Sequence, residues 1–192
     1  MNAYTTKLDE AMALATDSFR GIFRKGTRIP YLTHLMSVAA MVGEGGGDEE
    51  QIIAAMLHDY LEDIPGATHA GLEAQFGARV ARMVVALSDS TTLPKPPWRE
   101  RKEEYVAHLG DEPAEVKLIS TADKLHNCRS IVRDHQARGD AIFEIFAGKK
   151  DGTLWYYRSL LPALSKDWDH PLLEELRVEV RRLHRMAAVP FE

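Results

Sequence analysis

Cysteine is almost absent from this chain, and so are long apolar runs. Cys128 is the single cysteine among 192 residues, so no disulfide can form within the chain and a reducing compartment is expected. No stretch approaches the roughly 20 apolar residues that a membrane-spanning helix needs. The N-terminal residues include acidic side chains and lack the apolar segment of a signal peptide. We therefore expect a soluble, cytoplasmic protein with no membrane partner.

An excess of positive charge is also missing. The net charge is -5, which argues against a nucleic-acid partner, because non-specific binding to a phosphate backbone usually requires a basic face. This charge leaves room for a local basic pocket that binds a small phosphorylated ligand. With 45% hydrophobic and 28% charged residues, the composition is that of a globular protein with a substantial core.

No window shows the alternating pattern of strands, whereas apolar residues at helical spacing recur along the chain. The sequence predicts helices over residues 8–19, 32–42, 48–63, 68–76, 78–89, 101–110, 111–132, 153–164 and 171–186. Loops are expected at 90–98, where three prolines exclude a regular helix, and at 148–152. The predicted fold class is all-α, a single-domain helical bundle over residues 1–192, with 166–192 as a C-terminal helical appendage.

The segment MLHDYLEDIP ends an apolar helix with four polar side chains, those of His58, Asp59, Glu62 and Asp63. Buried charges are costly unless they are paired or bind a metal. Adjacent helical residues lie ~100° apart, so His58 and Asp59 could both touch one ion at the edge between them. Imidazole and carboxylate groups suit a divalent transition metal. The alternative is an exposed acidic helix end ahead of the helix-breaking Pro65.

Two further residues could complete such a site. His34 lies in the apolar segment YLTHLMSVAA, and Asp123 lies in ISTADKLHN. Each alone has an ordinary interpretation, because a lone histidine in an apolar helix is often a hydrogen-bonded core residue and an Asp–Lys pair often faces solvent. The order His, His-Asp, Asp, each within an apolar helix, is difficult to obtain by chance, and it predicts a metal centre.

With these residues the chain resembles the HD-domain metal-dependent phosphohydrolases. The segments RKGTRIPYLTHLMSVA, AAMLHDYLEDI, FGARVARMVVALSD and TADKLHN resemble, in this order, the hydrolase domain of RelA/SpoT-type enzymes and especially the stand-alone small alarmone hydrolases. The similarity covers residues 23–164. The chain departs from the family pattern at Ile64-Pro65 and at Thr121, which concern the rim of the pocket more than its metal.

The resemblance implies a helical HD fold and a reaction. The implied metal site holds one Mn²⁺ between His34, His58, Asp59 and Asp123. The implied reaction is hydrolysis of the 3′-pyrophosphate of (p)ppGpp, which gives GDP or GTP and pyrophosphate. Glu62 and Asp63 match the catalytic acidic pair, which would position or deprotonate a water activated by the metal.

The resemblance also implies residues that bind the nucleotide. Arg24 and Lys25 match the base-binding pair, in which a planar guanidinium can stack on a purine, and Asn127 matches a ribose contact. Tyr156 or Tyr157 is expected to line the nucleoside pocket. The alternatives are an ordinary basic loop, a polar residue on a helix face and core tyrosines.

Other polar residues have less defined expectations. The candidates to meet the charge of the pyrophosphate are Lys95, Arg99, Lys102, Lys149 and Lys150. The histidines expected to be structural or on the surface are His69, His108, His135, His170 and His184. His126 precedes Asn127 on the same predicted helix, and Cys128 is expected to be a buried small apolar residue.

Two other functions remain open from the sequence. One is an HD phosphohydrolase that acts on another phosphorylated nucleotide, such as the 2′-phosphate of NADPH or a nucleoside phosphate. The other is a non-catalytic HD protein that binds a nucleotide as a sensor. The Glu62-Asp63 pair argues against a pure sensor, which needs no water-activating group beside its metal. The sequence leaves the oligomeric state open.

Overall fold

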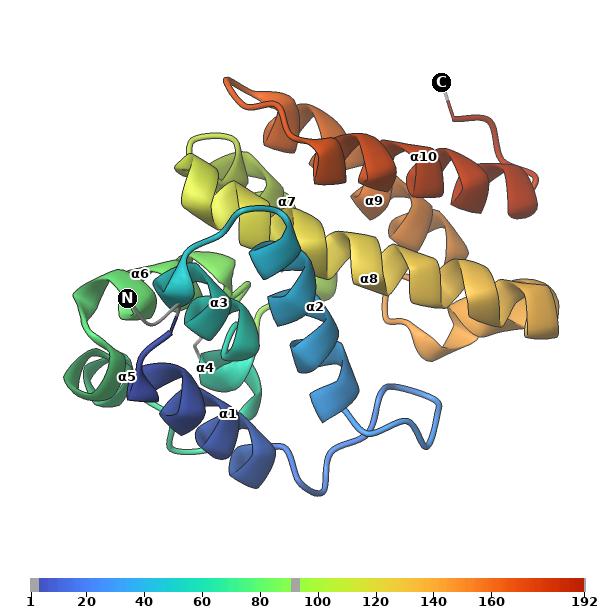
Figure 1. The fold of residues 1–192 in the computed structure, drawn as a ribbon. Helices are drawn as coiled ribbons and strands as arrows, with labels where there is room; N and C mark the ends of the chain where they lie inside the picture. Colours follow the sequence, from blue (N-terminus) through green and yellow to red (C-terminus); the bar gives the residue numbers. More distant parts are fainter. Residues whose placement is uncertain (1–3, 91–93, 192) are drawn as a thin grey trace.

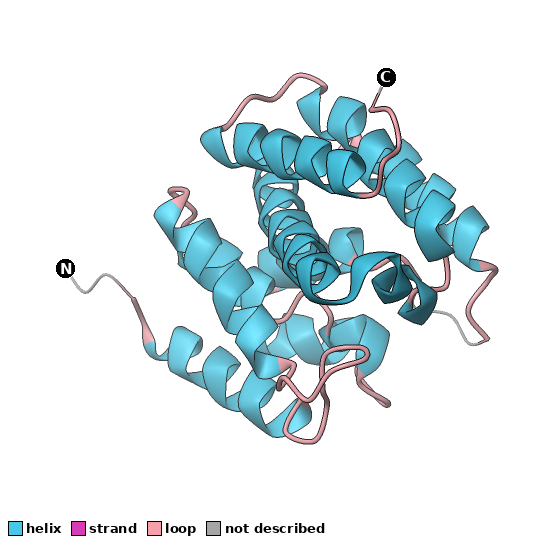
Figure 2. Ribbon diagram, turned by 90° about the vertical axis from the view of Figure 1, so that its right-hand side faces the viewer, coloured by secondary structure: helices cyan, strands magenta, loops and turns pink. Residues whose placement is uncertain are grey.

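The structure is a computed structural model that describes residues 4–90 and 94–191, and it confirms the all-α prediction (Figures 1 and 2). The helices are α1 (Thr6–Ser18), α2 (Leu32–Glu44), α3 (Glu49–Met56), α4 (Tyr60–Asp63), α5 (His69–Phe76), α6 (Ala78–Leu87), α7 (Trp98–Leu109), α8 (Ala114–Arg138), the 3-10 helix η1 (Gly139–Ile145), α9 (Lys149–Ser165) and α10 (Pro171–Met186). No strand occurs within these described ranges, which contain one isolated bridge between Phe23 and Pro30.

Several helices begin where the sequence supplies a cap. The side chain of Asp48 accepts a hydrogen bond from the amide of Gln51, and the Gln51 side chain bonds back to the Asp48 amide, which forms a capping box at the start of α3. Thr68 caps α5 in the same way through its hydroxyl. These caps satisfy amide groups that the first helical turn leaves without partners.

Helix α8 is the centre of the fold (Figure 1). Its 25 residues give it a length of roughly 37 Å, and most of its N-terminal half is buried. Helices α2, α3 and α6 pack against it on one side, and α9 and α10 pack on the other. Side chains of α8 therefore pack against both groups of helices, α2, α3 and α6 on one side and α9 and α10 on the other.

Helix α10 packs along α8 and α9 through an apolar stripe. The buried residues of this stripe are Leu173, Leu176, Val180 and Leu183. The division at residue 166 into a bundle and an appendage stays a prediction. Within the described residues, no helix is both long and apolar enough to cross a membrane.

The helix predicted over residues 48–63 is wrong in one respect that matters for the site. Helix α3 ends at Met56, and His58 and Asp59 lie in a turn before α4. Nδ1 of His58 donates to the carbonyl oxygen of Ala55 at 2.7 Å, an oxygen to which an uninterrupted helix would bond the Asp59 amide. The histidine side chain thus replaces a main-chain bond and ends the helix.

The loop predicted at 148–152 is also wrong, because α9 begins at Lys149. Its glycines serve close packing: a Cβ atom on Gly148 would lie 2.5 Å from the ring of Trp98, and one on Gly152 would lie 2.9 Å from it. Helix α7 begins at this tryptophan, three residues earlier than predicted, and α8 extends to Arg138. Of the predicted loop at 90–98, residues 91–93 lie outside the described residues.

Candidate metal centre and substrate cavity

Four side chains from separate parts of the fold converge on one point. His34 lies on α2, Asp123 lies on α8, and His58 and Asp59 lie in the turn after α3. Nε2 of His58 is 3.0 Å from Oδ2 of Asp59 and 3.7 Å from Oδ1 of Asp123. Nε2 of His34 is 3.2 Å from Oδ1 of Asp123 and 3.8 Å from Oδ2 of Asp59. Ligands bound at about 2.1 Å to one ion lie roughly 3.0–3.5 Å apart, so this spacing fits a coordination sphere.

The two histidines present unpartnered nitrogens to this point. Nε2 of His34 and Nε2 of His58 are both buried, and neither has a hydrogen-bond partner among the described residues. The other nitrogen of His58 donates to the Ala55 carbonyl, so a neutral His58 ring would present its lone pair at Nε2. Buried polar atoms without partners are rare, and here they mark a place for a cation. The nearest possible ligand atoms of His34, His58 and Asp59 lie within 4.8 Å of one another.

The charges of the centre also favour a cation. Burial alone would lower the pKa of His58, but the carboxylates of Asp59 and Asp123 raise that pKa well above its ordinary value. Burial alone would raise the pKa of Asp123, but Lys124 and the two histidines hold it well below its usual range. The two carboxylates thus draw positive charge to this point, and a divalent ion would supply it.

Around these four residues lies a set of partners that orients them. The hydroxyl of Tyr31 donates to Oδ2 of Asp59 at 2.6 Å, and the ammonium of Lys124 lies 2.5 Å from Oδ2 of Asp123. The amide of Asn127 donates to Oδ1 of Asp123 at 2.5 Å. Such contacts fix the direction of a metal ligand and tune its basicity. Sequence reasoning missed Tyr31 and assigned no role to Lys124.

His126 is a further partner that sequence reasoning left without a role. Its Nδ1 lies 2.8 Å from Nδ1 of His34, so one ring must donate and the other accept. If Nε2 of His34 offers its lone pair to a metal, the proton of the neutral ring sits on Nδ1 and donates to His126. Burial, followed by the charges of His34 and Arg24, lowers the pKa of His126 to about 4, which keeps it neutral and able to accept.

Glu62 and Asp63 lie on α4, one turn after the predicted ligands. The ammonium of Lys95 lies 2.9 Å from Oε1 of Glu62 and 3.9 Å from Oδ1 of Asp63. Burial and the charge of Asp59 raise the pKa of Asp63 to about 6, and burial also raises the pKa of Glu62. Both carboxyl groups are therefore shifted toward neutral pH, where a general base is effective.

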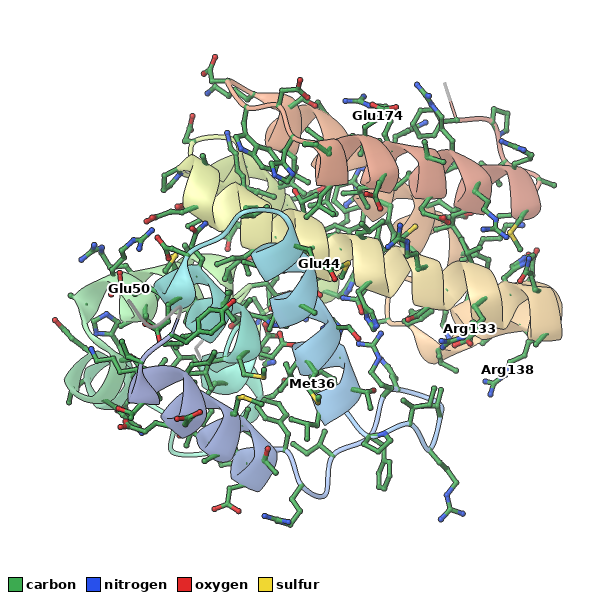
Figure 3. All side chains as sticks on the ribbon, viewed as in Figure 1. Met36, Glu44, Glu50, Arg133, Arg138 and Glu174 are labelled. Atoms are coloured by element: carbon green, nitrogen blue, oxygen red, sulfur yellow. The ribbon has the colours of Figure 1, made fainter. Side chains whose placement is uncertain are left out.

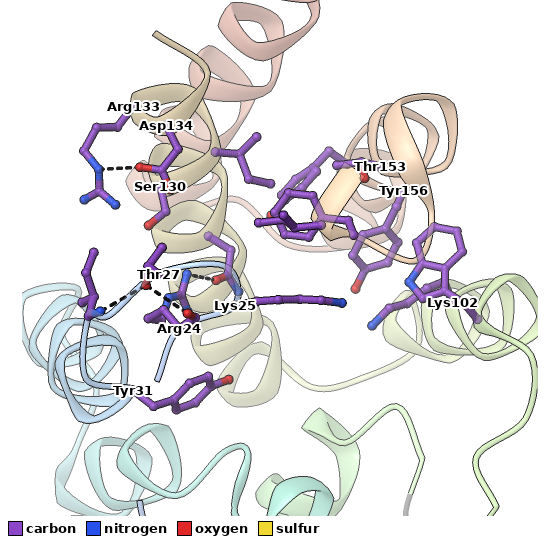
Figure 4. Close-up of a pocket in the computed structure, with 17 residues that line it drawn as sticks. Arg24, Lys25, Thr27, Tyr31, Lys102, Ser130, Arg133, Asp134, Thr153 and Tyr156 are labelled. Carbon is purple, nitrogen blue, oxygen red and sulfur yellow. Dashed lines mark hydrogen bonds and ion pairs between the residues drawn. The ribbon is translucent and has the colours of Figure 1, made fainter. Parts of the chain in front are cut away.

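A cavity of about 280 Å³ opens beside the centre (Figure 4). All four predicted substrate-binding residues line it, namely Arg24, Lys25, Asn127 and Tyr156. Figure 4 shows Arg24, Lys25 and Tyr31 on one side and Tyr156 with Lys102 on the other. Arg24 donates to Oδ1 of Asn127 at 2.7 Å, and Asn127 bonds Asp123, so a short chain of contacts joins the cavity to the centre.

The remaining basic candidates divide into two groups. Lys102 lines the cavity and Lys95 lies at the acidic pair, whereas Lys149 and Lys150 pair with Glu144 and Asp140 away from both. Arg99 stacks on Trp155 instead of lining the cavity. Trp98, which sequence reasoning did not single out, forms part of the wall.

The outer end of the cavity is basic as well. Arg133 and Arg138 extend from the C-terminal half of α8 toward the loop at residues 20–31 (Figure 3). Arg133 lines the cavity, and Arg138 lies 3.4 Å from the Gly26 carbonyl oxygen.

Of the residues that the sequence predicted to be structural, His184 and Cys128 are buried, and the side chain of His135 bonds that of Asp140.

Comparison with known proteins identifies the family of the chain. The HD-domain family matches residues 11–153 of the chain. Guanosine-3′,5′-bis(diphosphate) 3′-pyrophosphohydrolase MESH1 of Danio rerio is 37% identical over 132 residues, which are 67% of this chain and 71% of that protein. MESH1 of Homo sapiens is 35% identical over 136 residues, 69% of this chain and 74% of that protein.

Longer relatives and solved structures extend the likeness. The bifunctional (p)ppGpp synthase/hydrolase SpoT of Escherichia coli K12 is 34% identical over 65% of this chain, which corresponds to 18% of the SpoT sequence. The structure of a metazoan ortholog of SpoT that hydrolyzes ppGpp has the same fold, with a TM-score of 0.77, 23% identity, and coverage of 99% of this chain and 100% of that one. A Listeria monocytogenes protein gives a TM-score of 0.70 with 26% identity over 81% of this chain and 99% of its own.

Proposed function

Since the chain belongs to the HD-domain family, in the group that includes MESH1 and SpoT, we propose that it removes the 3′-pyrophosphate of (p)ppGpp and releases GDP or GTP and pyrophosphate. The observation that carries the proposal is the direct connection of two sites. A point of converging imidazoles and carboxylates lies one residue, Asn127, away from a basic, aromatic cavity. A nucleotide in this cavity would bring its phosphates to the metal centre.

The metal in this proposal is Mn²⁺, held by His34, His58, Asp59 and Asp123. The unpartnered Nε2 atoms and the paired carboxylates support these four residues as ligands. A bound divalent ion would polarise a phosphoryl oxygen and make water more acidic.

Glu62 and Asp63 are proposed to accept the proton of the attacking water. Burial raises the pKa of both carboxyl groups, that of Asp63 to about 6, and a carboxylate with a raised pKa is a better proton acceptor. Lys95, which now pairs with Glu62, is placed to exchange this carboxylate for a phosphate oxygen. Lys102 supplies a second ammonium group at the cavity wall.

The nucleoside is proposed to occupy the cavity beside Arg24. The guanidinium lies 5.8 Å from the centroid of the Tyr31 ring and has a planar face for a purine. Asn127 would bond the ribose, and Lys25 would meet the base or its phosphates. A cytoplasmic location belongs to the same proposal, because a guanosine nucleotide substrate and a single buried cysteine both fit a reducing compartment.

The test is turnover of ppGpp by purified protein with added Mn²⁺, in which GDP and pyrophosphate are both measured. We expect equal amounts of the two products, no turnover in EDTA, and none with His58→Ala. The Mn²⁺ content of both proteins is measured in parallel. If wild-type protein binds Mn²⁺ but leaves ppGpp intact, the substrate assignment is overturned, and NADPH and nucleoside monophosphates are tested next.

A further inference from the structure

The hydroxyl of Tyr156 is buried and forms no hydrogen bond of ordinary geometry with the described residues, and the ammonium of Lys124 is near enough to act on it directly. The side chain comes from α9, lines the cavity, and is 7% exposed. Figure 4 shows this hydroxyl directed into the cavity, on the side of Lys102. A buried hydroxyl without a partner destabilises a fold, so its retention calls for a ligand that bonds it.

The surroundings of this hydroxyl are cationic and lie next to the metal centre. The ammonium of Lys102 is 5.0 Å from the centroid of the Tyr156 ring. Lys124, Asp123 and Asp89 act on the hydroxyl through their charges, and Lys124 itself bonds the predicted metal ligand Asp123. Tyr156 therefore lines the cavity and lies close enough to the centre for the charge of Asp123 to act on its hydroxyl.

A chain of contacts links the acidic pair to the ring of Tyr156. Glu62 bonds Lys95, and its other carboxylate oxygen lies 3.4 Å from the amide nitrogen of Asp89. The Asp89 carboxylate bonds the ammonium of Lys102, which reaches the ring of Tyr156. Asp89 and Lys102 thus connect Glu62, which lies outside the cavity lining, to Tyr156 inside it.

We propose that Tyr156 is the catalytic acid that protonates the departing 3′-oxygen; this rests on the proposed function. The oxygen of water forms a bond to phosphorus while Glu62 or Asp63 takes its proton. The bond between phosphorus and the 3′-oxygen breaks, and this oxygen takes the proton of the Tyr156 hydroxyl. Lys102 and Lys124 stabilise the resulting phenolate until a proton reaches it through water, while Glu62 or Asp63 releases the proton it took to water, which restores both groups.

The state of the hydroxyl suits this step. Burial raises the pKa of Tyr156 to about 12, against the opposing effect of Lys124. The group is therefore protonated at neutral pH and has a proton to give. An alkoxide leaving group is far more basic than this phenol, so transfer to it is downhill.

The experiment compares wild-type protein and Tyr156→Phe on ppGpp and on an analogue whose 3′-oxygen is replaced by sulfur. A thiolate has a pKa near ~8.5 and leaves without a proton, so it needs no acid. We expect Tyr156→Phe to lower kcat on ppGpp by about 10²–10⁴-fold with little change in KM, and to lower kcat on the sulfur analogue by less than about threefold.

Tyr105→Phe is the matched control. This buried tyrosine donates to or accepts from Ser120 at 2.9 Å, and it does not line the cavity. Its loss should affect both substrates equally and lower the melting temperature, whereas Tyr156→Phe should leave the melting temperature unchanged or raise it.

Three outcomes with active wild-type protein overturn the inference alone: an equal loss on both substrates, a rise in KM at constant kcat, or no change. A marked loss of melting temperature in Tyr156→Phe would show that the hydroxyl has a structural partner, and it overturns the inference too. Failure of wild-type protein to hydrolyse ppGpp overturns the proposed function and this step with it.

Discussion

The metal centre and the cavity beside it differ in how their charges are paired. In the centre, each carboxylate has a partner: Tyr31 bonds Asp59, and Lys124 bonds Asp123. In the cavity, Arg24 bonds the neutral Asn127, and Lys25 has no bonded partner among the described residues. One region is built to receive a cation and the other to receive an anion. A phosphorylated nucleotide with a metal ion satisfies both at once.

The two regions also differ in the secondary-structure elements that supply their residues. The proposed ligands of the centre come from α2, the turn after α3, and α8, and these helices pack directly on one another. The cavity takes Arg24 and Lys25 from a loop and Tyr156 from α9. We expect substitutions in the centre to abolish chemistry, and substitutions of Arg24 or Lys25 in the cavity to weaken substrate binding. The predictions below test this division, from the largest effect to the smallest.

The first prediction concerns the acidic pair at the border of the two regions. Glu62→Gln together with Asp63→Asn should lower kcat by about 10²–10⁴-fold, because no carboxylate is left to accept the proton of water. Mn²⁺ content should remain at the wild-type level, since neither residue belongs to the converging set. The measurement is ppGpp turnover beside elemental analysis. Loss of the metal would assign these carboxylates to the centre instead.

In the metal centre, the sequence predicted the converging residues correctly but failed to predict the turn that carries two of them. Residue types alone identified His34, His58, Asp59 and Asp123, because polar groups at regular places in apolar helices are conspicuous, and the structure brings all four together. The turn after Met56 could not be predicted in the same way. Local pattern favours a continuous helix, and the helix ends because one side chain bonds a main-chain carbonyl.

Contacts between residues that are far apart in the sequence were also missed, because local patterns do not show which helices pack together. His126 and His34 are 92 residues apart, and only the packing of α8 on α2 brings their rings together. Gly148 and Gly152 carry the usual signal of a loop, but a tryptophan from another helix decides their role. The all-α class can be predicted because helical spacing is visible within short segments of sequence. The residues that orient the proposed ligands cannot be predicted in this way, because they come from distant parts of the chain.

The second prediction tests whether the centre depends on that second layer. His126→Ala removes the acceptor for Nδ1 of His34, so this ligand loses its fixed orientation. Affinity for Mn²⁺ should fall about 10–100-fold. Calorimetric titration of metal-free protein measures it. His108→Ala, which alters a histidine bonded to the Ala86 and Glu104 carbonyls, is the control. Equal affinity in both variants would mean that His126 does not orient His34.

The third prediction addresses the cavity. Arg24→Ala should raise KM for ppGpp about tenfold, because a guanidinium that stacks on the base is lost. Affinity for Mn²⁺ should stay within about twofold, since Arg24 bonds Asn127 and contacts none of the four proposed ligands. Arg28→Ala removes an exposed arginine of the same loop and is the control. A parallel loss of metal affinity in Arg24→Ala would contradict the division into two regions.

The last prediction concerns the stability of the metal-free protein, which depends on the ionisation of Asp63 beside the negatively charged Asp59. Burial, and then Asp59, raise the pKa of Asp63 from 3.8 to about 6 in the folded chain. A raised carboxyl pKa contributes stability that is full below 3.8 and is lost as the pH rises through about 6. At pH 7 the ionised Asp63 therefore destabilises metal-free protein.

Asp63→Asn should consequently make metal-free protein more stable than wild type at pH 7, and the difference should vanish below pH 3.8. The gain should be below about 1 kcal/mol, because the side chain is 36% exposed and solvent screens its charge. Urea unfolding at several pH values measures it. Saturating Mn²⁺ should shrink the gain, since a cation beside Asp59 offsets the negative charge that opposes Asp63. A gain independent of both pH and metal would show that Asp63 does not sense the charge of the centre.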